Sequence, residues 1–585
     1  MFITSVKEIL FWPLRRLGLT YPITYVLLAL RKRFGWQFIP YSSQAEPLFQ
    51  LRRVMHKSKS VLSEMAQLSV DGPIVLFPHM RGQSYGLAFE TLLAQRLRFD
   101  GARPIFLACQ DLPLCDNRYI DEPADPDICR YCLQTSRAYA KQMNLPLYTL
   151  SDLVSEESYK KAYEFTRSLA LNSCFHCQYR GVPIGELCEV SVTHYLCLDV
   201  QESASSEALQ TWRDFLTGAI VLVDAYDEAL SRFKPDILFV WNGRFFWNSV
   251  VLWMAQRRGI RIVSYETGLR NWEAGKYWLF RQEIAAAELD LNRPWRTWRD
   301  VPLTSDEDSQ LDKEMQRRTN DPVYYPDPVK SREIILNELG LKDDKPVVAM
   351  FPNLTWDSTV IGRRTIFKSV IEWVKETIRF AKRNRDFSLI IRVHPAETID
   401  LGGRGSREHV VDDIRREFGN LPDNIWIIPP DSKLSSYTLL DMASLVLVYT
   451  GTIGLEASIN AKSPVIICGR AHYADKGFGY FPQSREEYFE LLSNFNQLAP
   501  PSEQESALAR RLAYLYWFRT IIPLQFFTRD RRGRITHFTL DSLEDLLPGR
   551  NSYLDLIANG ILTGDEIVLP RELEREHRNN AIFPE

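Results

Sequence analysis

Short apolar runs alternate with helical patterns in the first half of the chain. Ile74–Phe77 and Ile237–Trp241 are typical of buried strands, and each run ends in a polar loop that contains glycine. Each loop leads into a helical pattern, at about 85–99 and about 248–258, and then into another strand pattern. Strand, helix and strand in this order form a βαβ unit, whose two strands are parallel. The first half is therefore predicted to contain a parallel sheet.

The same alternation returns in the second half. Residues 345–359 are typical of a strand and a polar loop, and 367–384 of a helix. The apolar run 389–391 follows, and 445–469 has the pattern strand, turn, helix, strand. Two doubly wound, Rossmann-like domains in series, facing each other across a ligand cleft, form the α/β architecture that this order favours.

Changes in composition suggest the domain limits. Polar residues and three prolines make 300–330 a candidate interdomain linker. The chain is divided into a basic amphipathic leader at 1–45, an N-terminal Rossmann-like domain at 46–330 with a cysteine-rich insertion at 109–197, a C-terminal Rossmann-like domain at 331–500, and a helical extension at 501–585.

The leader mixes bulky apolar residues with six lysines and arginines against one glutamate. Its apolar run, 21–30, is shorter than the ~18–20 residues that a spanning helix needs, and no small-residue cleavage site follows it. Such a segment could lie on the anionic inner leaflet of a membrane, or it could pack as a helix on its own domain.

Charge and cysteine content narrow the functional class. A net charge of -3 gives no whole-protein argument for binding nucleic acid. Nine cysteines in 585 residues do not suggest a secreted disulfide scaffold, so a reducing, cytoplasmic location is expected. Eight of the nine lie between Cys109 and Cys197.

Basic and small residues in the C-terminal domain predict an anion site. The strand at 389–391 delivers Arg392 and His394 at its carboxyl end, where α/β proteins hold anions. The strand near 448 ends in a small-residue turn that opens a helix, so that bare N–H groups and the positive helix end can meet a phosphate. The turn comprises Thr450, Gly451, Thr452 and Gly454. Neighbouring strands of one sheet are expected to place both groups side by side.

Two carboxylates of this domain each have two possible roles. Glu456, in the first turn of the helix, could accept hydrogen bonds from ribose hydroxyls or could only stabilise the helix start. Asp357 follows the first strand of the domain and could bind a sugar hydroxyl or cap the next helix.

Polar residues also follow the strands of the N-terminal domain. Their position beyond the carboxyl ends of the strands makes them candidates for binding a second substrate. They are His79, Arg81, Ser84, Asn242 and Arg244.

With these residues, the chain resembles bacterial capsular polysaccharide biosynthesis proteins, which are GT-B glycosyltransferases and include Kdo transferases that use a CMP-activated sugar. The matching pieces are IIRVHPAE, TGTIGLEASINAKSPVIICG and AHYADKGFGY, with WDS upstream, and they cover roughly 345–490. The resemblance implies that the N-terminal domain receives the acceptor and that the C-terminal domain binds the nucleotide-sugar.

The resemblance also assigns the catalytic carboxylate. Glu266-Thr267-Gly268 with Arg270 is similar to the acidic-x-Gly element of these inverting enzymes, so Glu266 would be the base and Arg270 would lie at the acceptor. Thr267 stands where related motifs usually carry a second acid. Glu266 could instead only bind a hydroxyl or cap a helix.

The cysteine-rich segment is similar to an insertion in some of these transferases. Cys115, Cys129 and Cys132, with Cys109 or the Cys174/Cys177 pair, could form a structural zinc site. They could equally be ordinary buried or surface thiols.

The leading hypothesis is an inverting, metal-independent glycosyltransferase that needs no cofactor for catalysis. It would act in the cytoplasm, with the cytoplasmic face of the inner membrane as one candidate location. It would transfer sugar from a nucleotide-sugar, with CMP-linked sugars among the candidates, to a capsular polysaccharide or a lipid-linked glycan. The catalytic residues would be Glu266 and His394. The alternatives are a nucleotide-sugar 2-epimerase and a noncatalytic glycan-binding component of an assembly complex.

Overall fold

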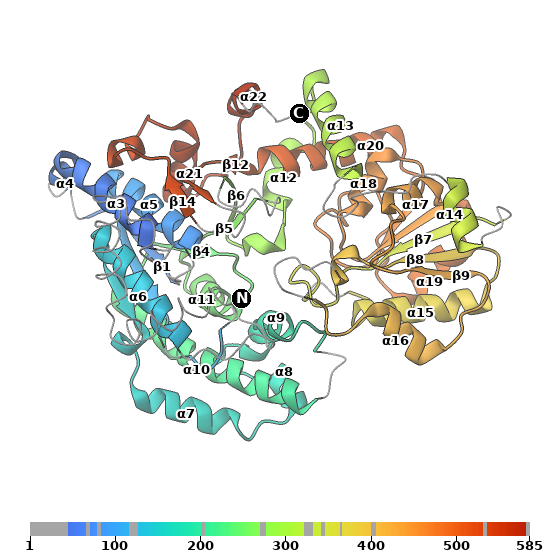
Figure 1. Cartoon of the computed structure of the whole chain (residues 1–585), viewed down its shortest axis with the longest axis horizontal. Helices are drawn as coiled ribbons and strands as arrows, with labels where there is room; N and C mark the ends of the chain where they lie inside the picture. Colours follow the sequence, from blue (N-terminus) through green and yellow to red (C-terminus); the bar gives the residue numbers. More distant parts are fainter. Residues whose placement is uncertain are drawn as a thin grey trace, which may run out of the picture. The chain divides into compact units, whose positions relative to one another are not determined.

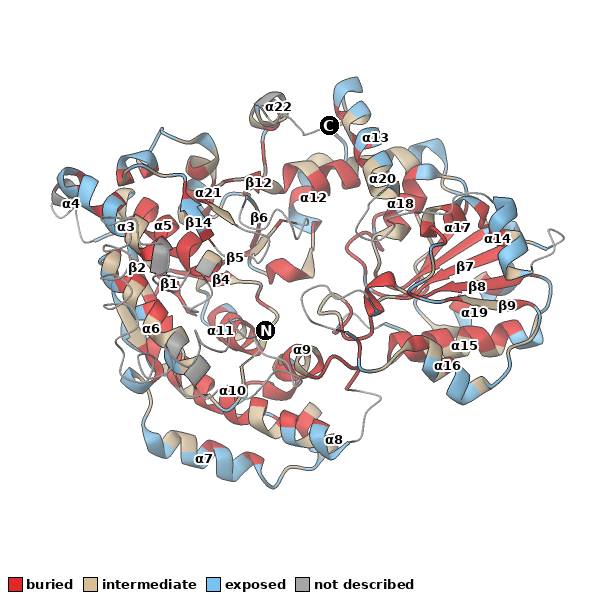
Figure 2. Cartoon of the chain, in the orientation of Figure 1, coloured by how far each residue is buried: buried red, intermediate tan, exposed pale blue. Residues whose placement is uncertain are grey.

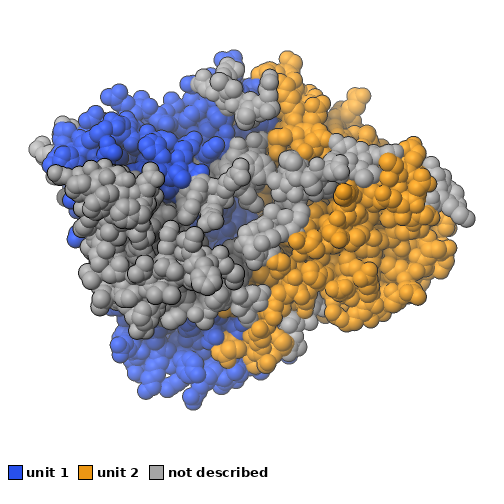
Figure 3. Space-filling model, viewed as in Figure 1, with its two compact units in different colours: residues 1–188, 211–287, 518–585 blue, residues 189–210, 288–517 orange. Residues whose placement is uncertain are grey.

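A computed structural model describes residues 45–65, 71–78, 84–110, 112–115, 127–200, 205–268, 276–320, 332–340, 345–362, 365–398, 405–529 and 535–580. The chain folds into two compact units, which Figure 3 shows in different colours. Unit 1 comprises 1–188, 211–287 and 518–585, and unit 2 comprises 189–210 and 288–517.

A seven-stranded sheet forms the centre of unit 1, in the order β12-β6-β5-β4-β1-β2-β3. Five neighbouring strands are parallel, while β6 and β12 are added antiparallel at one edge. The strands are β1 (Ile74–Phe77), β2 (Arg103–Ala108), β3 (Leu147–Thr149), β4 (Ile237–Trp241), β5 (Arg261–Thr267), β6 (Tyr277–Gln282) and β12 (Ile521–Pro523). The predicted parallel sheet is confirmed.

Helices complete unit 1. They are α3 (Ala45–Lys57), α4 (Lys59–Met65), α5 (Ser84–Phe99), α6 (Asp127–Gln142), α7 (Glu156–Thr166), α8 (Leu171–Phe175), α11 (Phe246–Arg257), α21 (Ser552–Thr563) and α22 (Arg571–Asn580). Two more helices, α9 (Ile184–Leu196) and α10 (Ser206–Phe233), contribute residues to both units. Apolar residues of α3, α5, α6 and α21 pack with those of the sheet in one core.

Unit 2 is built on five parallel strands in the order β11-β10-β7-β8-β9. They are β7 (Val347–Phe351), β8 (Ser388–Arg392), β9 (Ile425–Ile428), β10 (Leu445–Val448) and β11 (Val465–Ile467). Every residue of β7, β8, β10 and β11 is buried, as expected for parallel strands covered on both faces (Figure 2).

The helices of unit 2 lie on both faces of this sheet (Figure 1). Residues of α15 (Val370–Arg383), α16 (Val410–Phe418) and α19 (Arg485–Ser493) share one core with the strands. The others are α12 (Asn292–Trp298), α13 (Ser305–Thr319), α14 (Arg332–Leu339), α17 (Ser436–Met442), α18 (Ile453–Asn460) and α20 (Glu503–Tyr514). The predicted α/β class with two doubly wound sheets is confirmed, while the cleft between the domains stays a prediction.

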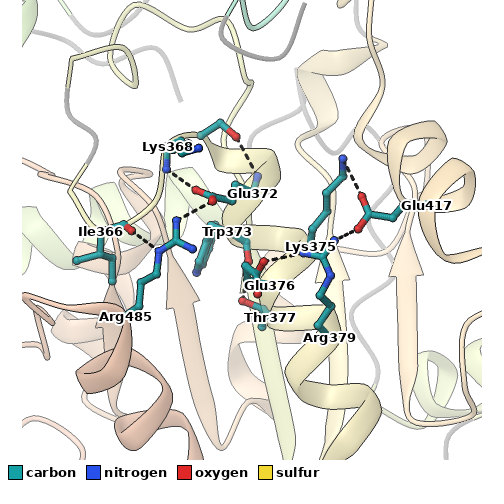
Figure 4. A network of polar contacts seen from close by, with 11 residues as sticks. Ile366, Lys368, Glu372, Trp373, Lys375, Glu376, Thr377, Arg379, Glu417 and Arg485 are labelled. Carbon is teal, nitrogen blue, oxygen red and sulfur yellow. Dashed lines mark hydrogen bonds and ion pairs between the residues drawn. The ribbon is translucent and has the colours of Figure 1, made fainter.

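Ion pairs tie α15 to its two neighbours (Figure 4). Glu372, in the first turn of α15, accepts from the backbone N–H of Lys368 and from Nη2 of Arg485 on α19, the latter at 2.6 Å. On α16, Glu417 pairs with Lys375 at 3.0 Å. Partly exposed pairs of this kind contribute about 0–1 kcal/mol each, so their main effect is to fix how the helices meet.

Two stretches differ from the pattern expected from sequence. Residues 300–330, interpreted as a linker, contain α13, whose N-cap Thr304 exchanges hydrogen bonds with Glu307 in a capping box. The stretch 501–585 contains the expected helices and also three short strands, β12, β13 (Phe527–Arg529) and β14 (Ile535–Phe538). The predicted domain limits stay predictions, and residues 1–44 of the leader lie outside the described residues.

Candidate functional site

The strand order of unit 2 defines one point of the sheet edge where the winding reverses. Numbered within the unit, the order is 3-2-1-4-5, so the direction of winding reverses between β7 and β10. In doubly wound sheets, ligands bind beyond the carboxyl ends of the strands at this reversal. Asn353, just beyond β7, and the 450–454 turn, just beyond β10, are the residues at that position.

This order corrects one prediction. The strand that carries Arg392 and His394, β8, is not a neighbour of β10, because β7 lies between them and pairs with both. Parallel strands lie about 4.8 Å apart, so the ends of β8 and β10 are separated by roughly 10 Å. The first strand of a doubly wound sheet is central, so β7 separates the two strands that were predicted to be neighbours. His394 and the turn share one edge of the sheet with the β7 loop between them.

Several donors of the 450–454 turn have no acceptor in the part of the chain that the structure describes. The backbone N–H of Thr450 donates to Oδ1 of Asn353 at 3.0 Å, which links the two sides of the reversal. Within the described residues, the N–H groups of Gly451, Thr452 and Ile453 have no hydrogen-bond acceptor. The hydroxyl of Thr450 is buried and also lacks a partner among the described residues. These groups can cradle an anion.

Tyr473 holds the shape of this turn. Its buried hydroxyl donates to the carbonyl of Gly451, which also accepts from the N–H of Gly454 at 3.2 Å. Burial, followed by the neighbouring Glu456 carboxylate, raises the pKa of Tyr473, so the phenol stays protonated and can donate. A Cβ atom at residue 454 would lie 2.3 Å from this hydroxyl oxygen, so the position requires glycine.

Glu456 is held by protein groups. Its side chain is buried, Oε2 accepts from the hydroxyl of Tyr437 at 2.8 Å, and Oε1 lies 3.4 Å from Nη1 of Arg318. The Arg318 guanidinium stacks on Trp517 at 4.0 Å. Of the two readings left open by the sequence, this geometry favours the structural one, and a contact between Glu456 and a ribose stays a prediction.

His394 is a neutral hydrogen-bond donor. Its Nδ1 accepts from the N–H of Ala396 at 3.1 Å, so the proton of the neutral ring is on Nε2. Burial lowers the pKa of His394 to about 4, while Asp357 opposes the shift and Arg392 adds to it. The ring is half-buried rather than sealed in the core. At neutral pH it can donate from Nε2 but carries no charge.

Arg392 and Asp357 have different local roles. The guanidinium of Arg392 is buried and donates to the carbonyls of Val393 and Ser432, at 3.2 and 3.3 Å, and to that of Pro429. It therefore holds the loop after β9, and its predicted contact with a donor phosphate stays a prediction. Asp357 accepts from the N–H of Thr359 at 2.8 Å, which fixes its loop near His394.

In unit 1, Glu266 is oriented by four donors. Oε1 accepts from the indole N–H of Trp241 at 2.9 Å and from the N–H and hydroxyl of Thr267 at 2.8 and 3.2 Å. Among the described residues, Oε2 accepts from the amide of Asn242 alone, at 2.7 Å. A carboxylate oxygen has two lone pairs, so Oε2, with one donor of this kind, has capacity for another hydroxyl. Glu266 is half-buried at the carboxyl end of β5.

Asn242 and Gly243 form a strained turn beside Glu266. Their φ angles are 62° and 86°, and a Cβ atom on Gly243 would lie 2.6 Å from Cβ of Ala285. Oδ1 of Asn242 accepts from the N–H of Arg244 at 3.0 Å. A non-glycine residue with positive φ is uncommon and often marks a functional site. The turn also lies at the reversal of the unit 1 sheet, between β1 and β4.

Most of the remaining predicted residues lie in parts of the chain that the structure does not describe. His79, Arg81, Arg270 and the side chain of Ser84 lie outside the described residues. Two residues were missed from the sequence, Asn353 and Tyr473. Asn353 directly follows the first strand of its sheet, which is a usable signal, whereas Tyr473 acts from beyond the next strand.

The proposed zinc site is not supported. Across the described ranges, no group of three or more histidine, cysteine or acidic side chains is arranged to hold a metal ion. The thiols of Cys109 and Cys132 lie near each other, with Cys115 and Cys129 in their vicinity. The neighbouring Cys132 thiol, and then burial, raise the pKa of Cys109 in the metal-free protein.

Residues 331–489 match the family model described as capsule polysaccharide biosynthesis protein. The match runs from just before α14 into α19, and it confirms the resemblance for this part of the chain. A sequence search of curated proteins finds no match.

Solved structures of nucleotide-sugar enzymes match most of the chain at low identity. A UDP-GlcNAc 2-epimerase from Neisseria meningitidis bound to UDP-GlcNAc is 12% identical, with 75% of this chain and 97% of that chain covered and a TM-score of 0.23. The spinosyn rhamnosyltransferase SpnG complexed with spinosyn aglycone is 11% identical, with 75% and 95% covered and a TM-score of 0.23. At such low sequence identities and TM-scores, neither similarity is used to infer an activity.

Proposed function

We propose that this protein is an inverting glycosyltransferase that takes a sugar from a nucleotide-sugar, with CMP-linked sugars among the candidates, and transfers it to a capsular polysaccharide or a lipid-linked glycan. The observation that carries the proposal is the set of unused donors at the 450–454 turn, at the winding reversal of unit 2. Fixed backbone donors stabilise the charge that develops on a departing phosphate.

The proposed reaction is a single displacement. An acceptor hydroxyl attacks the anomeric carbon, the bond from that carbon to the phosphate oxygen breaks, and the nucleotide leaves as an anion. Oε2 of Glu266 takes the hydroxyl proton. The N–H groups of Gly451, Thr452 and Ile453 and Nε2–H of His394 donate to the donor substrate. The reaction is proposed to need no metal ion. It is proposed to take place in the cytoplasm.

A screen of nucleotides tests the donor half of the proposal. CMP, UDP, GDP and their sugars are added in turn, and at least one is expected to raise the melting temperature, because a ligand that binds the native state stabilises it. Incubation of that nucleotide-sugar with an acceptor glycan then separates the functions. A transferase releases free nucleotide and extends the glycan, an epimerase changes only the sugar, and a binding protein changes neither.

Replacing His394 with alanine is expected to weaken nucleotide binding by about ten- to a hundredfold, since a hydrogen bond to a charged group contributes roughly 1.5–3 kcal/mol. The loss should be the same at pH 8 and pH 6, because the folded pKa of about 4 keeps the ring neutral at both. Calorimetry measures both effects, with the exposed His537→Ala as control. Unchanged affinity in His394→Ala, or a loss that titrates near pH 6.5, would contradict the assignment.

A further inference from the structure

The C-terminal half of α3 has a basic outer face. Four residues of this helix are exposed, as far as its side chains are described, and none is acidic. They are Arg52, Arg53, His56 and Lys57. Lys59, which begins α4, is also exposed. A helix face that only faces water usually carries both signs of charge, so a single sign marks an electrostatic surface.

The opposite face of α3 fixes this surface on unit 1. Leu48, Leu51, Val54 and Met55 are buried in the core of the unit. Gln50 bonds to β14 in both directions, donating to the carbonyl of Thr536 at 3.1 Å and accepting from the N–H of Phe538 at 2.9 Å. Asp541 pairs with Lys57 and also lies near Arg53. The helix is therefore attached to unit 1 through its apolar face and exposes basic side chains on the other face.

The chain that leads into α3 has the same charge. In residues 1–59, ten lysines and arginines stand against two glutamates, although the whole chain has a net charge of -3. The first 44 residues also contain Trp12, Trp36 and three tyrosines, together with many aliphatic residues. Trp and Tyr favour the level of lipid headgroups, and basic residues favour anionic leaflets. This composition suits a lipid surface better than a soluble polyanion.

We propose that the basic face of α3 binds the surface of an anionic membrane. Each lysine or arginine close to such a leaflet is attracted by its negative potential, and the attraction falls with salt because it is screened over about 10 Å at 0.1 M. Because the apolar face of α3 is packed in the core of unit 1, binding through the basic face would fix the orientation of unit 1 on the membrane. This proposal is independent of the sugar-transfer reaction.

Sedimentation of the full chain with lipid vesicles tests the proposal. Wild type is expected to bind phosphatidylcholine vesicles that contain about 30% phosphatidylglycerol and not pure phosphatidylcholine vesicles. The variant R52E/R53E should bind at least about fivefold more weakly, because two attractive charges become repulsive. The matched control K160E/K161E changes the charge equally on the exposed face of α7 and should bind as wild type.

Three outcomes would overturn the proposal. R52E/R53E could bind as wild type, which would assign the binding to residues 1–44 alone. Neutral vesicles could be bound equally well. The protein could bind soluble dextran sulfate but not anionic vesicles, which would assign the surface to a polyanion. Melting temperatures check that each variant is folded, and R52Q/R53Q, with a smaller expected loss, replaces R52E/R53E if that variant does not fold.

Discussion

Replacing Glu266 with glutamine is expected to slow sugar transfer by a factor of about 10²–10⁴, the range over which a positioned general base acts, and to leave nucleotide affinity unchanged. Three donors hold Oε1 and the Asn242 amide donates to Oε2, so the glutamine oxygen should stay at Oε1. Its NH₂ group should replace Oε2, with loss of the hydrogen bond from Asn242. An amide nitrogen in that position cannot accept the proton of an acceptor hydroxyl. The side chain keeps its size, so the fold should be retained.

Turnover, nucleotide affinity and melting temperature together test this prediction. Glu228→Gln, at an exposed position of α10 in the same unit, is the matched control and should behave as wild type in all three. Wild-type turnover in Glu266→Gln would remove Glu266 from the reaction. A fall in nucleotide affinity as large as the fall in turnover would give it a role in binding rather than in proton transfer.

Replacing Gly454 with alanine is expected to reduce nucleotide affinity at least about a hundredfold and to destabilise the protein by roughly 1–3 kcal/mol, the usual cost of overpacking a core. The new methyl group would lie 2.3 Å from the Tyr473 hydroxyl oxygen and 2.8 Å from Cγ2 of Val448. Tyr473 would have to move, and its hydrogen bond to the Gly451 carbonyl would be lost. The backbone donors of the turn would then no longer converge.

Gly451→Ala is the matched control for Gly454→Ala, because it also replaces a glycine of the turn but causes no steric clash. A Cβ atom there would lie 3.8 Å from the nearest side-chain atom, an ordinary contact, so the free energy of unfolding should change much less than in Gly454→Ala. Calorimetry gives the affinities, and denaturant unfolding gives the stabilities. Wild-type nucleotide affinity in a destabilised Gly454→Ala protein would mean that the nucleotide binds elsewhere.

The pattern of apolar runs predicted the parallel sheets because buried strands are apolar throughout. It could not give the order of the strands, which depends on how each crossover turns. The sequence motifs at the ends of β8 and β10 therefore did not show that β7 lies between these two strands. Asn353 could have been found, since it follows the first strand and therefore lies at the winding reversal. The capping box of Thr304 and Glu307 likewise signalled α13.

Side-chain direction was the harder part of the site. Arg392 and His394 are two residues apart at the end of one strand, yet the guanidinium bonds to backbone carbonyls while the imidazole is only half-buried. Glu456 bonds to Tyr437 and is near Arg318, which come from α17 and α13. Contacts between groups so far apart in the chain leave no local pattern. The turn itself was predictable because small residues and a helix start stand together.

Amide hydrogen exchange measured by mass spectrometry, with and without a saturating nucleotide or nucleotide-sugar, tests the central claim most directly. The account predicts that the ligand slows exchange in the peptide covering 449–456, because the N–H groups of Gly451, Thr452 and Ile453 would donate to its phosphate. A ligand that binds fully while exchange in this peptide stays unchanged would contradict the account.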